Sequence, residues 1–278
     1  MQYCFRRKYI EIIINNMLII CNGTFKSGSS WLHHIIKEIL RLRNIKISDI
    51  PISYNRDVKS PTRILEKNLK GFILNEDINN NVYLTKAHYF QKETLNRIYS
   101  EDIVFFFINR DIRDSIVSHY HHFINFRKMN ISFTTYFRFI GIFKAYEMYL
   151  FKERCKESFR ESHFFTFESL KNDFPESIKR VAYLLGIDNL SNKEIDIIRN
   201  NTSINKMRDK SVKGDLNYYP ELKDQSWKLF RKGNIGDWKL YFNNINISII
   251  DNIISGNASS YIKVIYYLIF TLRRKFLG

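Results

Sequence analysis

The chain has 278 residues, enough for one large domain or two small ones. Hydrophobic residues make up 45% and aromatic residues 15% of it, which excludes a disordered chain and permits a sizeable core. The formal net charge of +16 favours a polyanionic partner: a nucleotide, a nucleic acid, an anionic membrane or an acidic glycan. A merely basic, soluble surface is the plain alternative.

Three scattered cysteines, Cys4, Cys21 and Cys155, offer neither a disulfide framework nor a Cys-x-x-Cys metal pair. A reducing cytoplasm is therefore predicted. Residues 1–16 lack the long apolar segment and small-residue cleavage site of a signal peptide, so they are expected to form an N-terminal extension.

Short apolar strands alternate with helical patterns along the chain. Strands are predicted at 17–21, 82–85, 103–108 and 163–167, and helices after the first, third and fourth strands, at about 31–40, 111–126 and 174–185. This alternation predicts a single α/β domain with a central parallel sheet flanked by helices. Ligands of such sheets bind beyond the carboxyl ends of the strands.

The loop between the first strand and its helix, NGTFKSGSSWL at 22–32, is similar to a phosphate-binding loop with a displaced lysine. Gly23 and Gly28 have the G-x-x-x-x-G spacing, but two serines follow where a nucleoside-triphosphate loop has Lys and Ser or Thr. The lysine, Lys26, lies inside the loop instead. Backbone N–H groups at the start of a helix favour an anion, although serines that only cap a helix would give the same pattern.

Two further stretches carry side chains suited to anions. RKGNIGDW at 231–238 places two cations and two glycines in a loop-like segment. In NRDIRDSIVSHYHHF at 109–123, Arg110 leaves the third strand and Ser118 follows eight residues later in a helix. Both side chains are expected to reach one phosphate.

Together these three stretches resemble the cytosolic type of sulfotransferase, which uses 3′-phosphoadenosine 5′-phosphosulfate (PAPS). The P-K-S-G-T-T-W loop of that family corresponds to FKSGSSW at 25–31, and its R-K-G-x-x-G-D-W is matched letter for letter at 231–238. The resemblance implies a P-loop-like sulfotransferase domain over 17–255, with a basic, apolar tail over 256–278.

The resemblance also implies the residues that hold PAPS. The 5′-phosphosulfate end would contact the loop, the 3′-phosphate would contact the arginine and serine of the second signature, and the adenine would contact aromatic and hydroxyl side chains. The loop residues for the phosphosulfate are Lys26, Ser27, Gly28, Ser29 and Ser30. The residues for the 3′-phosphate are Arg110 and Ser118. The residues for the adenine are Trp31, Phe167 (where a Tyr is usual), Thr202 and Ser203. Arg231, Lys232 and Gly233 would form a further anion site for the cofactor.

The catalytic residues are expected in YLTKAHYF at 83–90, which matches the family's K-x-H motif. His88 is the predicted general base for the acceptor, since imidazole titrates near neutrality. Lys26 would lie on the bridging oxygen of PAPS, and Lys86 would add positive charge near the transferring group. A purely structural histidine at the end of a strand is the alternative. Tyr89 and Phe90 replace the family's Leu-Pro, which leaves the acceptor pocket undefined.

No metal is expected to be required, because a sulfuryl group carries less charge than a γ-phosphate. Three histidines, His119, His121 and His122, suggest a metal site, but a zinc ion needs three or four convergent ligands. No Cys lies nearby and no acidic residue follows at a suitable spacing, so a helix that lines the cleft is preferred.

Two other functions stay open. A P-loop small-molecule kinase would need Mg²⁺ and a lysine after Gly28. A basic protein that binds RNA or an anionic membrane would need no chemistry, but no compact nucleic-acid motif is present and no nucleic acid is expected. The acceptor of a sulfotransferase would be a hydroxyl or amine of a glycan, a lipid or a small molecule.

The C-terminal tail contains an apolar run, 261–272, followed by Arg273, Arg274 and Lys275. Twelve residues are too few to cross a bilayer, which takes about 20. The run is expected to pack on the domain or to lie on an anionic membrane. The segment after Lys239 does not match the family's dimerisation signature K-x-x-x-T-V-x-x-x-E, so no dimer of that kind is inferred.

Overall fold

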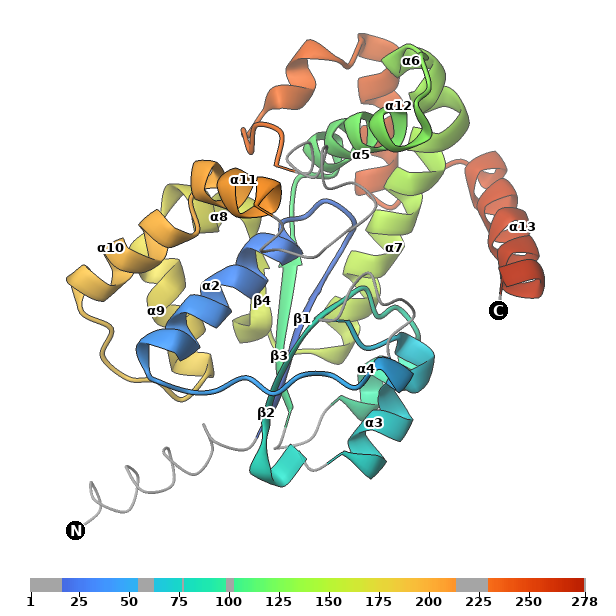
Figure 1. Ribbon diagram of the computed structural model, residues 1–278. Coiled ribbons are helices and arrows are strands. Elements are labelled where there is room, and N and C mark those ends of the chain that lie inside the picture. Colours follow the sequence, from blue (N-terminus) through green and yellow to red (C-terminus); the bar gives the residue numbers. More distant parts are fainter. Residues whose placement is uncertain (1–16, 55–62, 77, 99–102, 214–229, 278) are drawn as a thin grey trace. The chain divides into compact units, whose positions relative to one another are not determined.

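The computed structural model describes residues 17–54, 63–76, 78–98, 103–213 and 230–277 (Figure 1). The chain divides into two compact units. The first contains Met1–Gly23, Ser27–Asn109 and Ser158–Gly233, and the second contains Thr24–Lys26, Arg110–Glu157 and Asn234–Gly278. The expected N-terminal extension, 1–16, lies outside the described residues.

The first unit is built on a four-stranded parallel sheet with the strand order β2-β1-β3-β4. Its strands are β1 (Met17–Gly23), β2 (Val82–Ala87), β3 (Ile103–Asn109) and β4 (Phe164–Thr166). The central strand β1 is buried along its whole length, as expected for a parallel strand covered on both faces. The predicted α/β fold with a central parallel sheet is confirmed.

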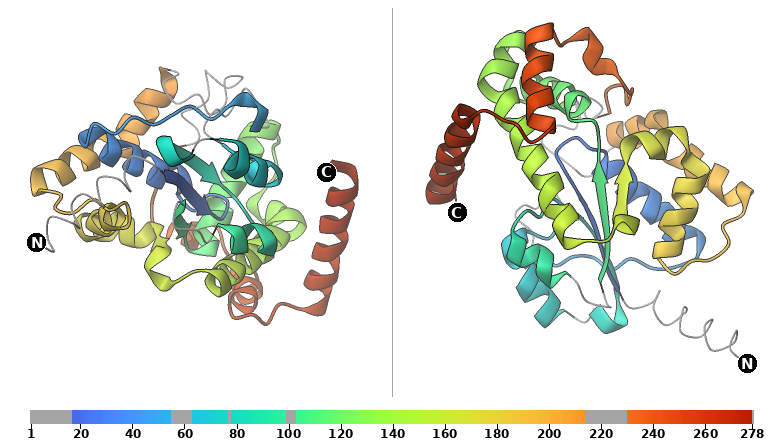
Figure 2. Two further views of the ribbon diagram at one scale, coloured as in Figure 1. Left: turned by 90° about the horizontal axis from the view of Figure 1, so that it is seen from below. Right: turned by 180° about the vertical axis from the view of Figure 1, so that it is seen from behind.

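Helices cover both faces of this sheet. Figures 1 and 2 show α2 (Ser29–Leu42), α9 (Phe174–Leu184) and α10 (Asn192–Asn201) on one face, and α3 (Leu69–Asn75) and α4 (Lys92–Arg97) on the other. On the first face, Ile36 and Val181 join Phe106 in one buried cluster. On the second face, the rings of Phe72 and Tyr83 lie 5.0 Å apart. Two further helices, α8 (Phe167–Asn172) and α11 (Ile204–Val212), belong to the same unit.

The fourth strand is shorter than the predicted 163–167. His163 ends a 3-10 turn (Glu161–His163), where its ring Nδ1 lies 2.8 Å from the carbonyl oxygen of Phe105. At the other end, the Thr166 side chain accepts a hydrogen bond from the backbone N–H of Ser169 and caps α8. Capping ends the strand at Thr166, so Phe167 begins a helix.

An ion pair joins two helices of the first unit. Arg43, the C-cap of α2, contacts Glu194 in the first turn of α10. The hydrogen bonds from Arg43 and from the Ser191 backbone lower the pKa of Glu194 from 4.5 to about 2. A lowered carboxyl pKa stabilises the fold above pH 4.5, and this contribution is lost as the pH falls from 4.5 towards 2.

Glu194→Gln should therefore lower the free energy of unfolding by about 1 kcal/mol at pH 7. The loss should shrink at pH 3, because the carboxylate of the unfolded chain is then mostly protonated and keeping it ionised in the folded protein contributes less stability. Glutamine can keep the capping box with Ser191, which isolates the effect of charge. Urea denaturation at both pH values measures this, and an equal loss at both would contradict it.

The second unit is helical in its described part. It contains α5 (Ile112–Arg127), α6 (Phe133–Tyr136), a π-helical turn (Phe137–Gly141), α7 (Ile142–Ser158, whose last residue belongs to the first unit), a 3-10 turn (Asp237–Leu240), α12 (Asn244–Ile254) and α13 (Ser260–Leu277). Its core is aromatic, with Phe133, Tyr136 and Phe137 buried. Much of the aromatic crowding in this region is therefore core packing, while Phe139 is exposed.

The C-terminal tail forms a helix, α13, with one packed face. Ile262 and Tyr266 are buried in the core of the second unit, and the Tyr266 ring meets Tyr146 edge-on at 5.2 Å. Tyr261 and Leu268 are exposed. None of the helices in the described part of the chain combines the length and apolarity needed to cross a membrane.

Candidate active site

The end of β1 fixes the segment that carries the predicted base. The buried Asn22 side chain donates a hydrogen bond to the backbone oxygen of Tyr89 at 3.1 Å and accepts one from the backbone N–H of Tyr89 at 2.8 Å. The buried Tyr89 hydroxyl donates to the carbonyl of Ile64 at 3.0 Å. These contacts hold His88 beside the carboxyl end of β1.

The His88 ring has a defined proton position. Its Nδ1 lies 2.6 Å from the carbonyl oxygen of Gly23. A carbonyl oxygen only accepts hydrogen bonds, so Nδ1 must carry the proton. In the neutral ring the lone pair then lies on Nε2, which is the form of histidine that can take a proton from an acceptor.

Lys86 lies on the neighbouring strand, opposite Cys21 in the register of β1 and β2. Its Nζ donates a hydrogen bond to the Ser30 hydroxyl at 3.1 Å. The ammonium group is therefore held at the first turn of α2, where the helix dipole also favours an anion. The structure thus brings Lys86 and the loop serine Ser30 together, as the predicted site requires.

Both loop glycines are needed by the local geometry. A Cβ atom on Gly23 would lie 2.7 Å from the Ile108 carbonyl oxygen, so no larger residue fits between β1 and β3. Gly28, the N-cap of α2, has φ of +99°, and a Cβ there would lie 2.9 Å from the Phe167 ring. Ser27 and Ser29, on either side of Gly28, are buried.

Phe167, one of the predicted adenine contacts, lies close to other predicted site residues. Its ring lies 5.4 Å from that of Trp31, and Trp31 in turn stacks on Phe174 at 6.2 Å. A Cβ on Gly233, which has φ of +62°, would lie 3.8 Å from the Phe167 ring. Four predicted residues from three distant segments, Gly28, Trp31, Phe167 and Gly233, thus gather in the first unit.

Two other predicted adenine residues have structural contacts. The buried Thr202 hydroxyl donates to the carbonyl of Ile198 at 2.7 Å and so satisfies the end of α10. Ser203 is the N-cap of α11 and donates to the Asn200 carbonyl at 2.9 Å. Their expected contact with adenine stays a prediction.

The first part of the RKGNIGDW segment is anchored through its backbone. The carbonyl oxygens of Arg231 and Gly233 accept hydrogen bonds from Arg208 and Lys171 respectively. The Arg231 side chain is half-buried and Lys232 is exposed. The backbone is thus fixed by two cations, and the predicted roles of Arg231 and Lys232 in cofactor binding stay predictions.

Lys26 belongs to the second unit and has φ of +60°, uncommon for a residue with a side chain. Its neighbour Phe25 lies under the Lys144 ammonium group at 4.5 Å and meets the His119 ring at 6.4 Å. Burial, followed by the charges of Lys26 and His119, lowers the pKa of His122 to about 3, so this ring is neutral at physiological pH.

Arg110 lies two residues before the start of α5, and its side chain is 8% exposed. Its Nη2 donates to the Asn234 carbonyl oxygen at 2.5 Å. Ser118 lies two turns into the same helix and is half-buried. Arg110 and Ser118 share the second unit with Lys26, whereas His88 and Lys86 belong to the first.

Two of the three histidines of α5 contact tyrosine hydroxyls. His119 Nδ1 lies 2.6 Å from the Tyr136 hydroxyl, and His121 Nε2 lies 2.8 Å from the Tyr241 hydroxyl. Within the described residues, no three side chains of His, Cys, Asp or Glu gather closely enough to hold a metal ion.

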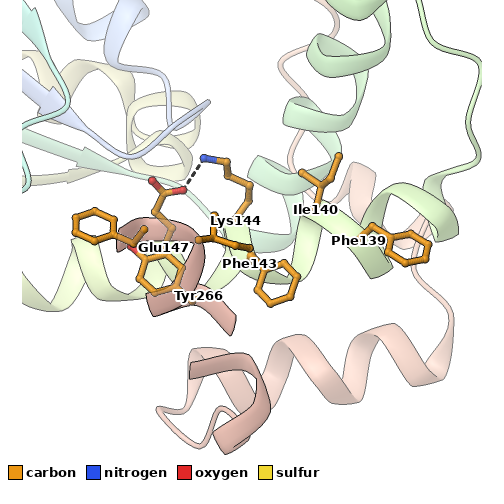
Figure 3. A pocket seen from close by; sticks show the side chains of 8 residues that line it. Phe139, Ile140, Phe143, Lys144, Glu147 and Tyr266 are labelled. Atoms are coloured by element: carbon orange, nitrogen blue, oxygen red, sulfur yellow. Dashed lines mark hydrogen bonds and ion pairs between the residues drawn. The ribbon is translucent and has the colours of Figure 1, made fainter. Parts of the chain in front are cut away.

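A small pocket of about 100 Å³ lies in the second unit, between α7 and α13 (Figure 3). Aromatic and aliphatic side chains line it, together with the ion pair between Lys144 and Glu147 at 2.5 Å. None of the predicted site residues lines this pocket.

Some supporting residues were not predicted from the sequence. Asn22 and the Gly23 carbonyl orient His88 across 65 or more residues of chain. Asp114 accepts hydrogen bonds from the backbone of Gly236 and Trp238. The G-x-x-x-x-G spacing indicates Gly23 as a loop residue. No local pattern, however, indicates which distant groups Asn22, Gly23 and Asp114 contact.

Comparisons with known proteins place the chain in a family. The family model described as "Sulfotransferase domain" matches residues 17–261. Human Sulfotransferase 6B1 is 26% identical over an alignment of 241 residues, which covers 79% of this chain and 69% of the relative. Sulfotransferase 1A1 of Canis lupus familiaris is 27% identical over 144 residues, about half of each chain (49% and 48%).

Solved structures share the fold. Mouse sulfotransferase SULT7A1, complexed with PAP, aligns with a TM-score of 0.62 and 18% identity over 94% of each chain. Retinol dehydratase in complex with retinol and PAP aligns with a TM-score of 0.57 and 16% identity, over 90% of this chain and 86% of that one. The resemblance seen in the sequence motifs is confirmed: the chain belongs to the sulfotransferase domain family and is an enzyme of sulfuryl transfer from PAPS.

Proposed function

We propose that this sulfotransferase moves the sulfuryl group of PAPS to a hydroxyl or amine acceptor with His88 as the general base. The observation that carries the proposal is the contact between His88 Nδ1 and the Gly23 carbonyl, which leaves Nε2 as the proton acceptor. The same contact ties the base to the end of β1, immediately before the loop that would hold the donor. A positioned base of this kind contributes about 10²- to 10⁴-fold to a rate.

In this mechanism the acceptor oxygen or nitrogen attacks sulfur in line with the departing bridging oxygen. The new bond to sulfur forms as the bond between sulfur and the bridging oxygen breaks, and the acceptor proton passes to His88 Nε2. The products are a sulfate ester or sulfamate and adenosine 3′,5′-bisphosphate (PAP). Lys26 would stabilise the charge that develops on the bridging oxygen, and Lys86 the charge on the transferring group. The proposed reaction requires no metal.

We assign the donor contacts from the side chains within each unit. The loop serines with Lys86 suit the phosphosulfate, and the pair of Trp31 and Phe167 suits a stacked adenine. Arg110 suits the 3′-phosphate, because a guanidinium can bind phosphate with two N–H groups. Mouse sulfotransferase SULT7A1 and retinol dehydratase, which share the fold, are both in complex with PAP, and this supports the choice of donor.

The acceptor is proposed to be a hydroxyl compound with an apolar body. Phe25, next to Lys26, contacts His119, and the neutral ring of His122 lies 4.1 Å from Phe126. The aromatic rings and the neutral imidazole in this part of the second unit suit an apolar molecule. Retinol dehydratase, which shares the fold, is found in complexes with retinol and with androsterone, and this supports such an acceptor.

The direct test is transfer of ³⁵S from labelled PAPS to a panel of acceptors that includes phenols, sterols, retinoid alcohols, amines and oligosaccharides. Labelled product with an apolar alcohol or phenol and none with oligosaccharides is expected. Product with oligosaccharides alone would overturn the acceptor class. No product with any acceptor, together with phosphate transfer from ATP–Mg²⁺, would overturn the reaction in favour of a kinase.

We further propose a reducing cytoplasmic location with peripheral membrane contact through α13. The two described cysteines, Cys21 and Cys155, are buried thiols, which supports a reducing compartment. The side of α13 that carries Tyr261, Val264 and Leu268 is exposed and apolar. Three basic residues follow in the sequence at 273–275, and each adds about 1 kcal/mol near an anionic surface.

The double variant Val264→Asp/Leu268→Asp should lower binding to vesicles of phosphatidylcholine with phosphatidylserine by at least about tenfold, because it places charge in the apolar contact. Val212→Asp, an equally exposed valine on α11, is the matched control. Co-sedimentation measures both. Wild-type protein that stays in solution with these vesicles at low salt would contradict the membrane contact.

A further inference from the structure

A buried carboxylate links α5 to the RKGNIGDW segment. Asp114 lies in the first turn of α5 and is 1% exposed. The backbone N–H of Gly236 donates to its Oδ2 at 2.7 Å, and the backbone N–H of Trp238 donates to its Oδ1 at 3.0 Å. One side chain thus holds two backbone donors that are more than 120 residues away in sequence.

The same carboxylate lies close to Arg110, the residue predicted to bind the 3′-phosphate. Arg110 Nη2 lies 3.8 Å from Asp114 Oδ2 and donates to the Asn234 carbonyl at 2.5 Å. The guanidinium is therefore directed by Asp114 and by a carbonyl of the loop that Asp114 itself holds. Such a charge-assisted arrangement fixes the direction of the planar guanidinium as well as its position.

The loop has little freedom to compensate for a change at Asp114. Gly236 has φ of +78° and is the N-cap of the 3-10 turn that contains Trp238. The guanidinium of Arg113 lies over the Trp238 ring at 4.3 Å, and Arg113 is held in turn by Asp111 at 2.8 Å and Asp251 at 3.5 Å.

We propose that Asp114 is a positioning residue for the donor: by holding the loop at 234–238 it directs Arg110 to the 3′-phosphate. This inference rests on the proposed function. Asp114 would touch neither donor nor acceptor and would act through Arg110. The buried carboxylate also balances the arginine's charge while the donor is absent. An asparagine would present an NH₂ group where at least one of the three neighbouring donors needs an acceptor.

The test measures the affinity of the full chain for PAP and for AMP, which lacks the 3′-phosphate, by calorimetry. Asp114→Asn should weaken PAP about tenfold and AMP less than twofold, as expected when a charged hydrogen-bonding network is disturbed. Asp251→Asn removes a carboxylate that contacts Arg113 but not the loop backbone, and should keep the wild-type ratio of affinities. The double variant Arg110→Ala/Asp114→Asn should bind PAP no more weakly than Arg110→Ala alone, because Asp114 acts through Arg110.

An unchanged ratio of PAP to AMP affinity in Asp114→Asn would overturn the inference, as would equal weakening of both ligands. If Asp114→Asn does not fold, Asp114→Glu decides. It keeps the charge but shifts the carboxylate by one methylene, so a selective loss of PAP affinity is expected and an unchanged ratio would refute the role. Wild-type protein without a preference for PAP over AMP would instead overturn the donor assignment, and this inference with it.

Discussion

Replacing His88 with alanine is expected to lower kcat by about 10²- to 10⁴-fold, the contribution of a positioned general base. The Kd for PAP should change less than about threefold, because the ring would act on the acceptor and not on the donor. The structural reason is the tautomer that the Gly23 carbonyl imposes, which leaves Nε2 able to accept a proton. Initial rates with labelled PAPS, together with calorimetric titration of PAP, measure both quantities.

His163 provides a matched control for this variant. Its Nδ1 also contacts a backbone carbonyl, that of Phe105, at 2.8 Å, but it precedes β4 instead of following a strand. His163→Ala should therefore leave kcat unchanged. An equal fall in kcat for both variants, or a fall in PAP affinity as large as the fall in kcat for His88→Ala, would show that His88 is structural.

Arg110→Ala is expected to weaken PAP by about 2 kcal/mol, or about 30-fold, the usual size of a hydrogen bond to a charged group. AMP, which has no 3′-phosphate, should bind as it does to the wild type. The side chain is almost fully buried and held by the Asn234 carbonyl, so the protein has already ordered it before the donor arrives. Competition of PAP and AMP against a fluorescent nucleotide measures the two affinities.

The control for this variant is Arg127→Ala. Arg127 is an exposed residue at the other end of α5, and its replacement removes the same charge from the same helix. It should weaken PAP by less than about twofold, since an exposed charge several turns away is largely screened. Similar losses for AMP and PAP in Arg110→Ala would mean that this arginine holds the fold and not the 3′-phosphate.

The sequence predicted most of what depends on local pattern. The strands at 17–21, 82–85 and 103–108 each fall within an observed strand, because apolar runs of this length suit a buried parallel sheet. The family could also be predicted from short segments, because a strand, a loop and a helix that bind an anion need glycines and cations in a fixed order. The fourth strand was predicted too long because helix capping by Thr166 competes with strand pairing.

The contacts that orient the site could not be predicted in the same way. His88 and the Gly23 carbonyl are separated by 65 residues, and Asp114 and the Gly236 N–H by 122. Such pairs depend on how the strands and helices are arranged in space. The residues that flank each partner in the sequence do not indicate this arrangement. The exposed apolar side of α13 is a further example. An apolar run is visible in the sequence, but only packing decides that Ile262 is buried and Leu268 is not.

Isothermal titration of the wild-type protein with PAP, AMP and ATP–Mg²⁺ tests the central claim most directly. Micromolar binding of PAP, with AMP and ATP–Mg²⁺ at least about tenfold weaker, is the result expected of a donor site that recognises the 3′-phosphate. Tight binding of ATP–Mg²⁺ without a preference for PAP would contradict the account and favour a kinase.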